Sequence, residues 1–143
     1  MARIIDKRVL ETILRDQQEE LVFRRSEKLC HRKEESMIDL NSTQAQVVIG
    51  VRRSGKSTLC FQALENAGVK YAYVDFDDER LKKISSEQLN DILETLYKIY
   101  GEFDYLFLDE IQNIVFHIDE KLAFRQVGIE GEQKHADLCA GCR

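Results

Sequence analysis

Two glycines separated by four residues and followed at once by lysine and serine form the most chemically informative pattern in this chain. The pattern spans Gly50-Val51-Arg52-Arg53-Ser54-Gly55-Lys56-Ser57. Glycines let a backbone turn tightly, and the N–H groups of such a turn form a nest for anions. Lys56 could reach the β- and γ-phosphates of a bound nucleotide, and the Ser57 hydroxyl could ligate Mg²⁺. The pattern therefore predicts a phosphate-binding loop, with an accidental glycine-rich turn as the plain alternative.

The segments on either side of this loop favour the phosphate-binding interpretation. Ala45–Ile49 is short, apolar and rich in β-branched residues, as expected of a buried parallel strand. A helix is expected to start near Lys56, with Cys60 on its apolar face, and to end at Gly68. The N-terminus of that helix would add partial positive charge where phosphates bind. A motif that follows a strand and opens a helix is more specific than the motif alone.

An acidic pair follows a second apolar run. Tyr105–Leu108 reads as a buried strand, and it leads directly into Asp109 and Glu110. A carboxylate at the tip of such a strand can hold Mg²⁺ in Walker-B chemistry. A glutamate in the next position can polarise the attacking water as a general base. The alternative is a solvated acidic turn after a core strand.

Three further elements complete the expected core. A long helix is predicted from about Asp6 to Lys28, with its apolar face interrupted at residues 17–20. Tyr71–Phe76 reads as another strand. A helix ending at Gly101 follows, and Ser85 and Gln88 form a plausible capping box at its start. Strands and helices that alternate at this spacing predict an α/β fold with a parallel sheet of three strands.

Composition limits the class of protein. The chain has 143 residues, a hydrophobic share of 43% and a net charge of −5, which suits one packed domain and argues against a nucleic-acid-coating protein. The start of the chain does not resemble a signal peptide, and no run of residues is long and apolar enough for a membrane span. We therefore expect a cytoplasmic protein whose four cysteines are free thiols.

The end of the chain carries a weaker metal pattern. His135, Cys139 and Cys142 have a spacing that zinc sites use, but zinc prefers four ligands. The nearest candidates for a fourth, Cys30 and His31, lie far away in the sequence. Two incidental thiols on a poorly ordered tail are the simpler interpretation.

Three segments, residues 50–58, 73–81 and 106–113, resemble the AAA domain of a large prokaryotic family of ATP-binding proteins. The resemblance implies a partial P-loop NTPase fold of the AAA/RecA-like kind, with three αβα layers preceded by an N-terminal helix. It implies ATP and Mg²⁺ as ligands, with the nucleotide held by residues 50–58, the last of which is Thr58. It also implies Lys56 at the phosphates, Ser57 and Asp109 at the metal, and Glu110 as the catalytic base.

The resemblance also suggests how the chain is organised. An N-terminal helical segment and connector would cover residues 1–44, and an incomplete core would cover residues 45–114. Residues 115–143 diverge and are expected to form a poorly ordered tail, as in a truncated or frameshifted reading frame. Full-length relatives continue with further strands and candidate arginine fingers, so hydrolysis is expected to be impaired here. The acidic segment 77–80 matches a family feature and is either adjacent to the site or a solvated loop.

Other functions fit the sequence less well. The base-reading Asn-Lys-x-Asp string of Ras-like GTPases does not occur, and a small P-loop kinase would need an arginine-rich lid that we do not find. A non-catalytic interaction module, or an inactive remnant of an ATPase, is the main alternative. Related sites are often completed at subunit interfaces, so a homo-oligomer or a protein partner is a further expectation. Neither a membrane nor nucleic acid is indicated.

Overall fold

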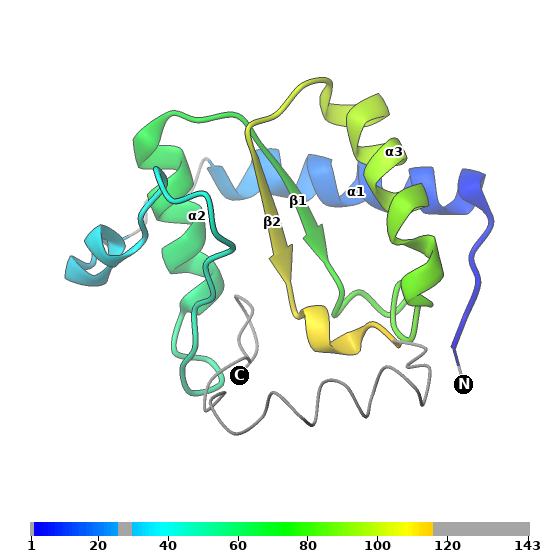
Figure 1. The fold of residues 1–143 in the computed structure, drawn as a ribbon, viewed down its shortest axis with the longest axis horizontal. Helices are drawn as coiled ribbons and strands as arrows, with labels where there is room; N and C mark the ends of the chain where they lie inside the picture. Colours follow the sequence, from blue (N-terminus) through cyan, green and yellow to red (C-terminus); the bar gives the residue numbers. More distant parts are fainter. Residues whose placement is uncertain (1, 26–29, 116–143) are drawn as a thin grey trace.

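Two parallel strands form the centre of the protein. The structure is a computed structural model, and it describes residues 2–25 and 30–115. Strand β1, Tyr71–Asp75, pairs with β2, Tyr105–Asp109, so that Tyr71 lies opposite Tyr105 and Asp75 lies opposite Asp109. Both strands are aromatic and aliphatic, which suits a pleated sheet covered on both faces. Their carboxyl ends lie side by side, beside the start of helix α2, Lys56–Ala67 (Figure 1).

One face of the sheet is covered mainly by α2. Phe61 lies at the centre of this layer, with its ring centroid 4.9 Å from that of Tyr73 and 5.2 Å from that of Phe107. The buried members of this cluster are Leu21, Cys60, Phe61, Leu64, Tyr71, Tyr73 and Phe107. Helix α2 ends as predicted at Gly68, which takes the left-handed conformation (φ +64°) that glycine adopts without strain.

The other face is covered by helix α1, Lys7–Arg25, and helix α3, Leu89–Tyr100. Figure 1 shows α2 and α3 on opposite sides of the strands, with α1 running across them. The larger core cluster lies here and comprises Ile5, Leu10, Ile13, Leu14, Ala72, Val74, Phe76, Leu81, Ile84, Ile92, Leu96 and Ile114. Three short 3₁₀ turns, Lys33–Met37, Ser86–Gln88 and Ile111–Asn113, join these elements. The predicted three-layer αβα arrangement, with an N-terminal helix, is confirmed.

Gln17 of α1 closes the outer edge of β1. Its side chain is buried, and its amide nitrogen donates to the carbonyl oxygen of Asp75 at 3.0 Å. Its amide oxygen accepts the Asp75 N–H, also at 3.0 Å, and the same amide nitrogen donates to Asp78 Oδ2 at 3.2 Å. One side chain therefore replaces part of a missing neighbouring strand. Gln17 interrupts the apolar face of α1 as the sequence predicts, but its side chain is buried because its partners lie on the sheet.

Replacing Gln17→Leu should lower the free energy of unfolding by about 2 to 3 kcal/mol, because it leaves buried backbone groups of Asp75 unpaired. Gln18→Leu is the matched control, since Gln18 is only half-buried and is expected to change stability by less than about 0.5 kcal/mol. Urea unfolding of the two variants beside the wild type measures both values. Equal stability of the two variants would contradict this role of Gln17.

The prediction of a strand at Ala45–Ile49 was wrong. Among the described residues only β1 and β2 form a sheet, and Ile49 is 58% exposed. The preceding loop holds the segment in another way, because the Gln46 side chain hydrogen-bonds to the backbone of Asp39. A cavity of about 200 Å³ separates this segment from β2. Paired strands lie about 4.8 Å apart, so no hydrogen-bonded ladder can form across that gap.

Two smaller expectations need comment. Ser85 caps the turn before α3 by accepting the Glu87 N–H, but Gln88 does not complete a capping box. The Gln88 side chain instead exchanges two hydrogen bonds of 2.7 Å with the backbone of Ile5. Helix α1 is described to Arg25, so the predicted extension to Lys28 lies outside the described residues. So does the expected poorly ordered tail, apart from Val115.

Candidate functional site

The predicted phosphate loop connects residue 49 to the first turn of α2, at the same end of the molecule as the carboxyl ends of both strands (Figure 1). Gly55 precedes the helix in a left-handed conformation (φ +83°), and Arg53 is also left-handed (φ +62°). The Ser54 N–H donates to the Val51 carbonyl oxygen at 3.1 Å, which tightens the turn. Val51, Arg52 and Arg53 are exposed, so their side chains do not contribute to the core.

Lys56 points back over this loop. It is buried, and its Nζ donates to the carbonyl oxygens of Gly50 at 3.1 Å and Val51 at 2.9 Å. A Cβ atom on Gly50 would make ordinary contact with Cδ of Lys56 at 3.4 Å, and it would lie tightly against Oγ of Ser54 at 3.2 Å. The ammonium group therefore sits at the start of the loop, where two backbone carbonyl oxygens hold it.

Arg32 is a residue of this site that the sequence did not indicate. Its Nη1 donates to the Ser54 carbonyl oxygen at 2.7 Å, and a Cβ atom on Gly55 would lie only 2.6 Å from its Nη2. The turn at residues 33–37 positions it, because the Glu35 side chain accepts both the Arg32 N–H at 3.0 Å and the Asn66 amide at 2.7 Å. Arg32 lies 18 residues before Gly50, outside any recognisable motif, so only the folded chain reveals it.

Asp109 meets the first turn of α2 at the end of β2. Its carboxyl group is buried, and burial raises its pKa, while the hydrogen bond from the Ser57 hydroxyl opposes that rise. Oδ1 also accepts the Glu110 N–H at 3.1 Å, and the Tyr73 hydroxyl lies 3.4 Å from Oδ2. Asp75 is its partner across the sheet, and burial raises the pKa of that carboxyl group as well. The fold thus brings Ser57 and Asp109 together from segments about fifty residues apart.

Glu110 lies just beyond the strand. Its backbone is left-handed (φ +52°), which turns the chain away from β2. Its carboxylate is half-buried and accepts a hydrogen bond from the Gln112 amide. The side chain is therefore near the carboxyl end of the sheet, but a local partner holds it.

A comparison with known protein families identifies the family of this chain. The family model for the AAA domain matches residues 42–124, which include the loop, Lys56 and the acidic pair. The chain belongs to the AAA-domain family. This match covers more than half of the chain, and it begins after α1.

This AAA domain is also similar to an uncharacterized protein of Methanocaldococcus jannaschii. The two are 34% identical over 117 residues, which is 80% of this chain. The same alignment covers 25% of that protein, so the chain spans about a quarter of the length of its relative. No solved structure matches the chain.

The acidic segment after β1, residues 77–80, forms ion pairs within the AAA domain. The guanidinium of Arg80 holds the pKa of Asp78 well below its usual range, at about 2, and the two groups lie 2.8 Å apart. Arg80 also pairs with Asp16 of α1, and Lys82 pairs with Glu79. These contacts connect the segment to α1 and to its own turn. The described side chains of this segment therefore have structural partners.

The described part of the AAA domain offers few candidate metal ligands. No group of three or more histidine, cysteine or acidic side chains gathers there, and Cys30 is exposed while Cys60 is buried. Burial raises the pKa of the Cys60 thiol to about 12, as suits a core residue. The hydroxyl of Ser57 beside the carboxylate of Asp109 is a donor pair that fits Mg²⁺, which keeps several waters and takes few protein ligands. His135, Cys139 and Cys142 lie outside the described residues.

No helix in the described part of the chain has the length and apolar character of a membrane span.

Proposed function

We propose that this AAA domain binds Mg²⁺–ATP. The proposal is supported by the placement of the Lys56 ammonium over the predicted phosphate loop, together with the buried carboxyl group of the predicted Walker-B acid Asp109, whose pKa the Ser57 hydroxyl lowers. The Lys56 ammonium, folded over the same loop, adds the positive charge that phosphate oxygens require. An accidental glycine-rich turn would not need a buried carboxylate beside the serine.

Each residue of the site has its own role in this proposal. Backbone N–H groups of residues 50–57 bind phosphate oxygens, and Lys56 donates to the β- and γ-phosphates. Ser57 and Asp109 would hold Mg²⁺, and the bound ion would neutralise charge on the phosphates. Glu110 orients the attacking water and accepts its proton after leaving Gln112.

A second candidate function is a non-catalytic interaction module. The open edge of β2 favours it, because Leu106 is 43% exposed and a cavity separates this edge from residues 45–48. Unpaired strand edges are templates for other chains. A homo-oligomer or a protein partner of the ATPase would use such a surface. We place this function in the cytoplasm, where free thiols are usual.

Calorimetry with Mg²⁺–ATP tests the proposed function. Lys56→Ala should weaken binding at least about 100-fold, because a buried ammonium that contacts phosphate is lost. Lys70→Ala is the matched control, since Lys70 precedes β1 at the opposite end of the sheet, and its affinity should stay within about twofold of the wild type. Unchanged ATP affinity in Lys56→Ala would refute the assignment.

A further inference from the structure

Two adjacent arginines at the end of α1 lie beside α2 and differ in their contacts. Arg25 is held in place, because its Nε donates to a carboxylate oxygen of Glu65 at 2.7 Å and its guanidinium lies over the Tyr71 ring. Arg24 is exposed, and its guanidinium lies over the Phe61 ring, 5.9 Å from the centroid. Within residues 2–25 and 30–115, Arg24 forms neither a hydrogen bond nor an ion pair. Its N–H donors are therefore available to a ligand.

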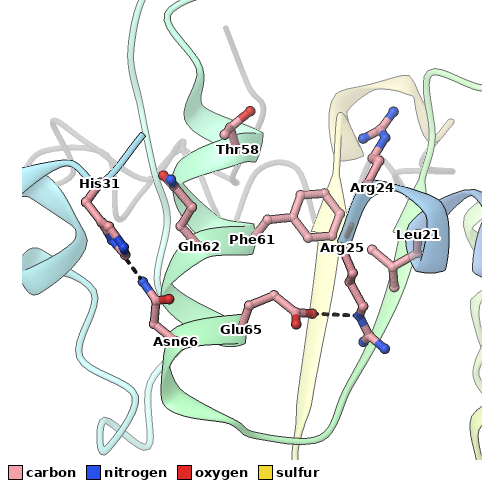
Figure 2. Close-up of a pocket in the computed structure, with 9 residues that line it drawn as sticks. All are labelled: Leu21, Arg24, Arg25, His31, Thr58, Phe61, Gln62, Glu65 and Asn66. Carbon is pink, nitrogen blue, oxygen red and sulfur yellow. Dashed lines mark hydrogen bonds and ion pairs between the residues drawn. The ribbon is translucent and has the colours of Figure 1, made fainter. Parts of the chain in front are cut away.

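The Arg24 side chain points toward the end of α2 that carries the phosphate loop. Figure 2 shows its guanidinium on the side of Thr58, whereas Arg25 points toward the other end of the helix. Phe61, on which Arg24 rests, follows Ser57 by four residues, which corresponds to about 6 Å along an α-helix. Arg24 is therefore about one helical turn away from the hydroxyl that the proposed function assigns to Mg²⁺.

Arg24 also lines two cavities. The larger one, of about 530 Å³, runs along α2, where Arg24 and Thr58 line it together. The smaller one, of about 160 Å³, lies at the carboxyl end of β1, where Arg24 lines it with Asp75 and Asp77. The guanidinium thus lies between the first turn of α2 and the acidic end of the sheet.

The positive charge of Arg24 acts on both carboxyl groups at the ends of the strands. Burial raises the pKa of Asp109, and the Ser57 hydroxyl and the charge of Arg24 are among the groups that oppose this rise. Burial likewise raises the pKa of Asp75, its partner across the sheet, and Arg24 again opposes the rise. A cation that affects two partly buried acids is close enough to attract an anion bound beside them.

We propose that Arg24 binds the terminal phosphate of the bound nucleotide, so that the site prefers a triphosphate to a diphosphate. The inference rests on the proposed function, in which Ser57 and Asp109 place Mg²⁺, and with it the outermost phosphate, near the first turn of α2. A guanidinium can donate two N–H groups to one phosphate, and such charge-assisted bonds are stronger than neutral ones. Arg24 lies outside residues 42–124, which match the family model, and it belongs to the same chain as Lys56, so this contact needs no partner subunit.

Calorimetry with Mg²⁺–ATP and with Mg²⁺–ADP tests this role on the whole chain. Arg24→Gln should weaken ATP binding about 10-fold, because the charge-assisted bonds to the terminal phosphate are lost. ADP lacks that phosphate, so its affinity should stay within about twofold of the wild type, since an exposed charge without a contact is screened by salt. An equal loss of affinity for ATP and ADP would overturn the proposal, because it would indicate a structural effect. So would a change of less than about twofold in the ratio of the two affinities.

Arg25→Gln is the matched control. It removes the same charge from the neighbouring residue, whose partner Glu65 lies near the other end of α2. The ratio of the ATP and ADP affinities should stay within about twofold of the wild type in this variant. If Arg25→Gln lowered the ratio as much as Arg24→Gln does, the effect would come from net charge, and the contact between Arg24 and phosphate would be wrong.

The wild type and Lys56→Ala separate this inference from the proposed function. If the wild type binds neither ATP nor ADP, the proposed function fails and the inference fails with it. If the wild type binds both and Lys56→Ala loses both, the proposed function holds. An unchanged ratio in Arg24→Gln would then show that the inference alone is wrong.

Discussion

Gly55→Ala is expected to weaken Mg²⁺–ATP binding by about 10-fold. The backbone of Gly55 has φ +83°, a conformation that costs an L-residue about 1 to 2 kcal/mol. The new Cβ atom would also lie 2.6 Å from Nη2 of Arg32, so either the loop or Arg32 must move. The exposed end of Arg32 is flexible and can move aside at little cost, so the backbone penalty dominates. Each 1.4 kcal/mol corresponds to a tenfold change in affinity, so this penalty amounts to about one order of magnitude.

Gly68→Ala is the control that carries the backbone strain without a contact to a neighbouring side chain. Gly68 is also left-handed (φ +64°), but nothing lies within 4 Å of a Cβ atom there, and it caps the opposite end of the same helix. This variant should lose about 1 kcal/mol of stability and keep its ATP affinity. Equal ATP affinities of Gly55→Ala and the wild type would contradict the described geometry of the loop.

Phe76→Ala is expected to lower the free energy of unfolding by about 3 to 5 kcal/mol. The ring is fully buried in the larger core cluster, and truncation of such a side chain removes its contacts and leaves a cavity. Total stabilities of small domains are about 5 to 15 kcal/mol, so this single change could unfold much of the population. The Phe76 N–H donates to the Asp109 carbonyl oxygen at 3.0 Å, a backbone bond that the substitution retains. The change therefore tests side-chain packing beneath the site.

Phe103→Ala is the matched control for Phe76→Ala. Phe103 is only partly buried, and its ring stacks on Tyr97 with centroids 4.6 Å apart. Its truncation should cost less than half as much as that of Phe76. Thermal unfolding of both variants, followed by circular dichroism, gives the comparison. If Phe103→Ala were the more harmful change, the core would not be centred on the cluster that contains Phe76.

The polar residues of the helices show why parts of this fold escape analysis of the sequence. Gln17, Gln62 and Gln88 are all buried, and each pairs with backbone atoms more than 30 residues away in the sequence. Local periodicity reports the apolar face of a helix, but it carries no information about distant hydrogen-bond partners. From the sequence, Gln17 was therefore interpreted as an interruption of the apolar face of α1, and Gln88 was interpreted as part of a helix cap.

Residues 45–49 show a second reason why a prediction from the sequence can fail. Their apolar, β-branched composition is typical of a strand, yet composition reports only that a segment suits a sheet. A strand also needs a neighbour at hydrogen-bonding distance, and the cavity beside β2 shows that this segment has none there. The same reasoning succeeded for β1 and β2, because each of these strands provides the ladder for the other.

The sequence by itself determined the elements whose cause is local. These are the three helices with their apolar stripes, the glycine that ends α2, both strands of the sheet, and the loop pattern that places Lys56 and Ser57 in one turn. Tertiary structure alone decided which distant atoms meet: the Ser57 hydroxyl with Asp109, Arg32 with the backbone of Ser54, and Gln17 with the edge of β1. Such pairings depend on how the layers pack, and the one-dimensional spacing of residues does not encode that packing in any local pattern.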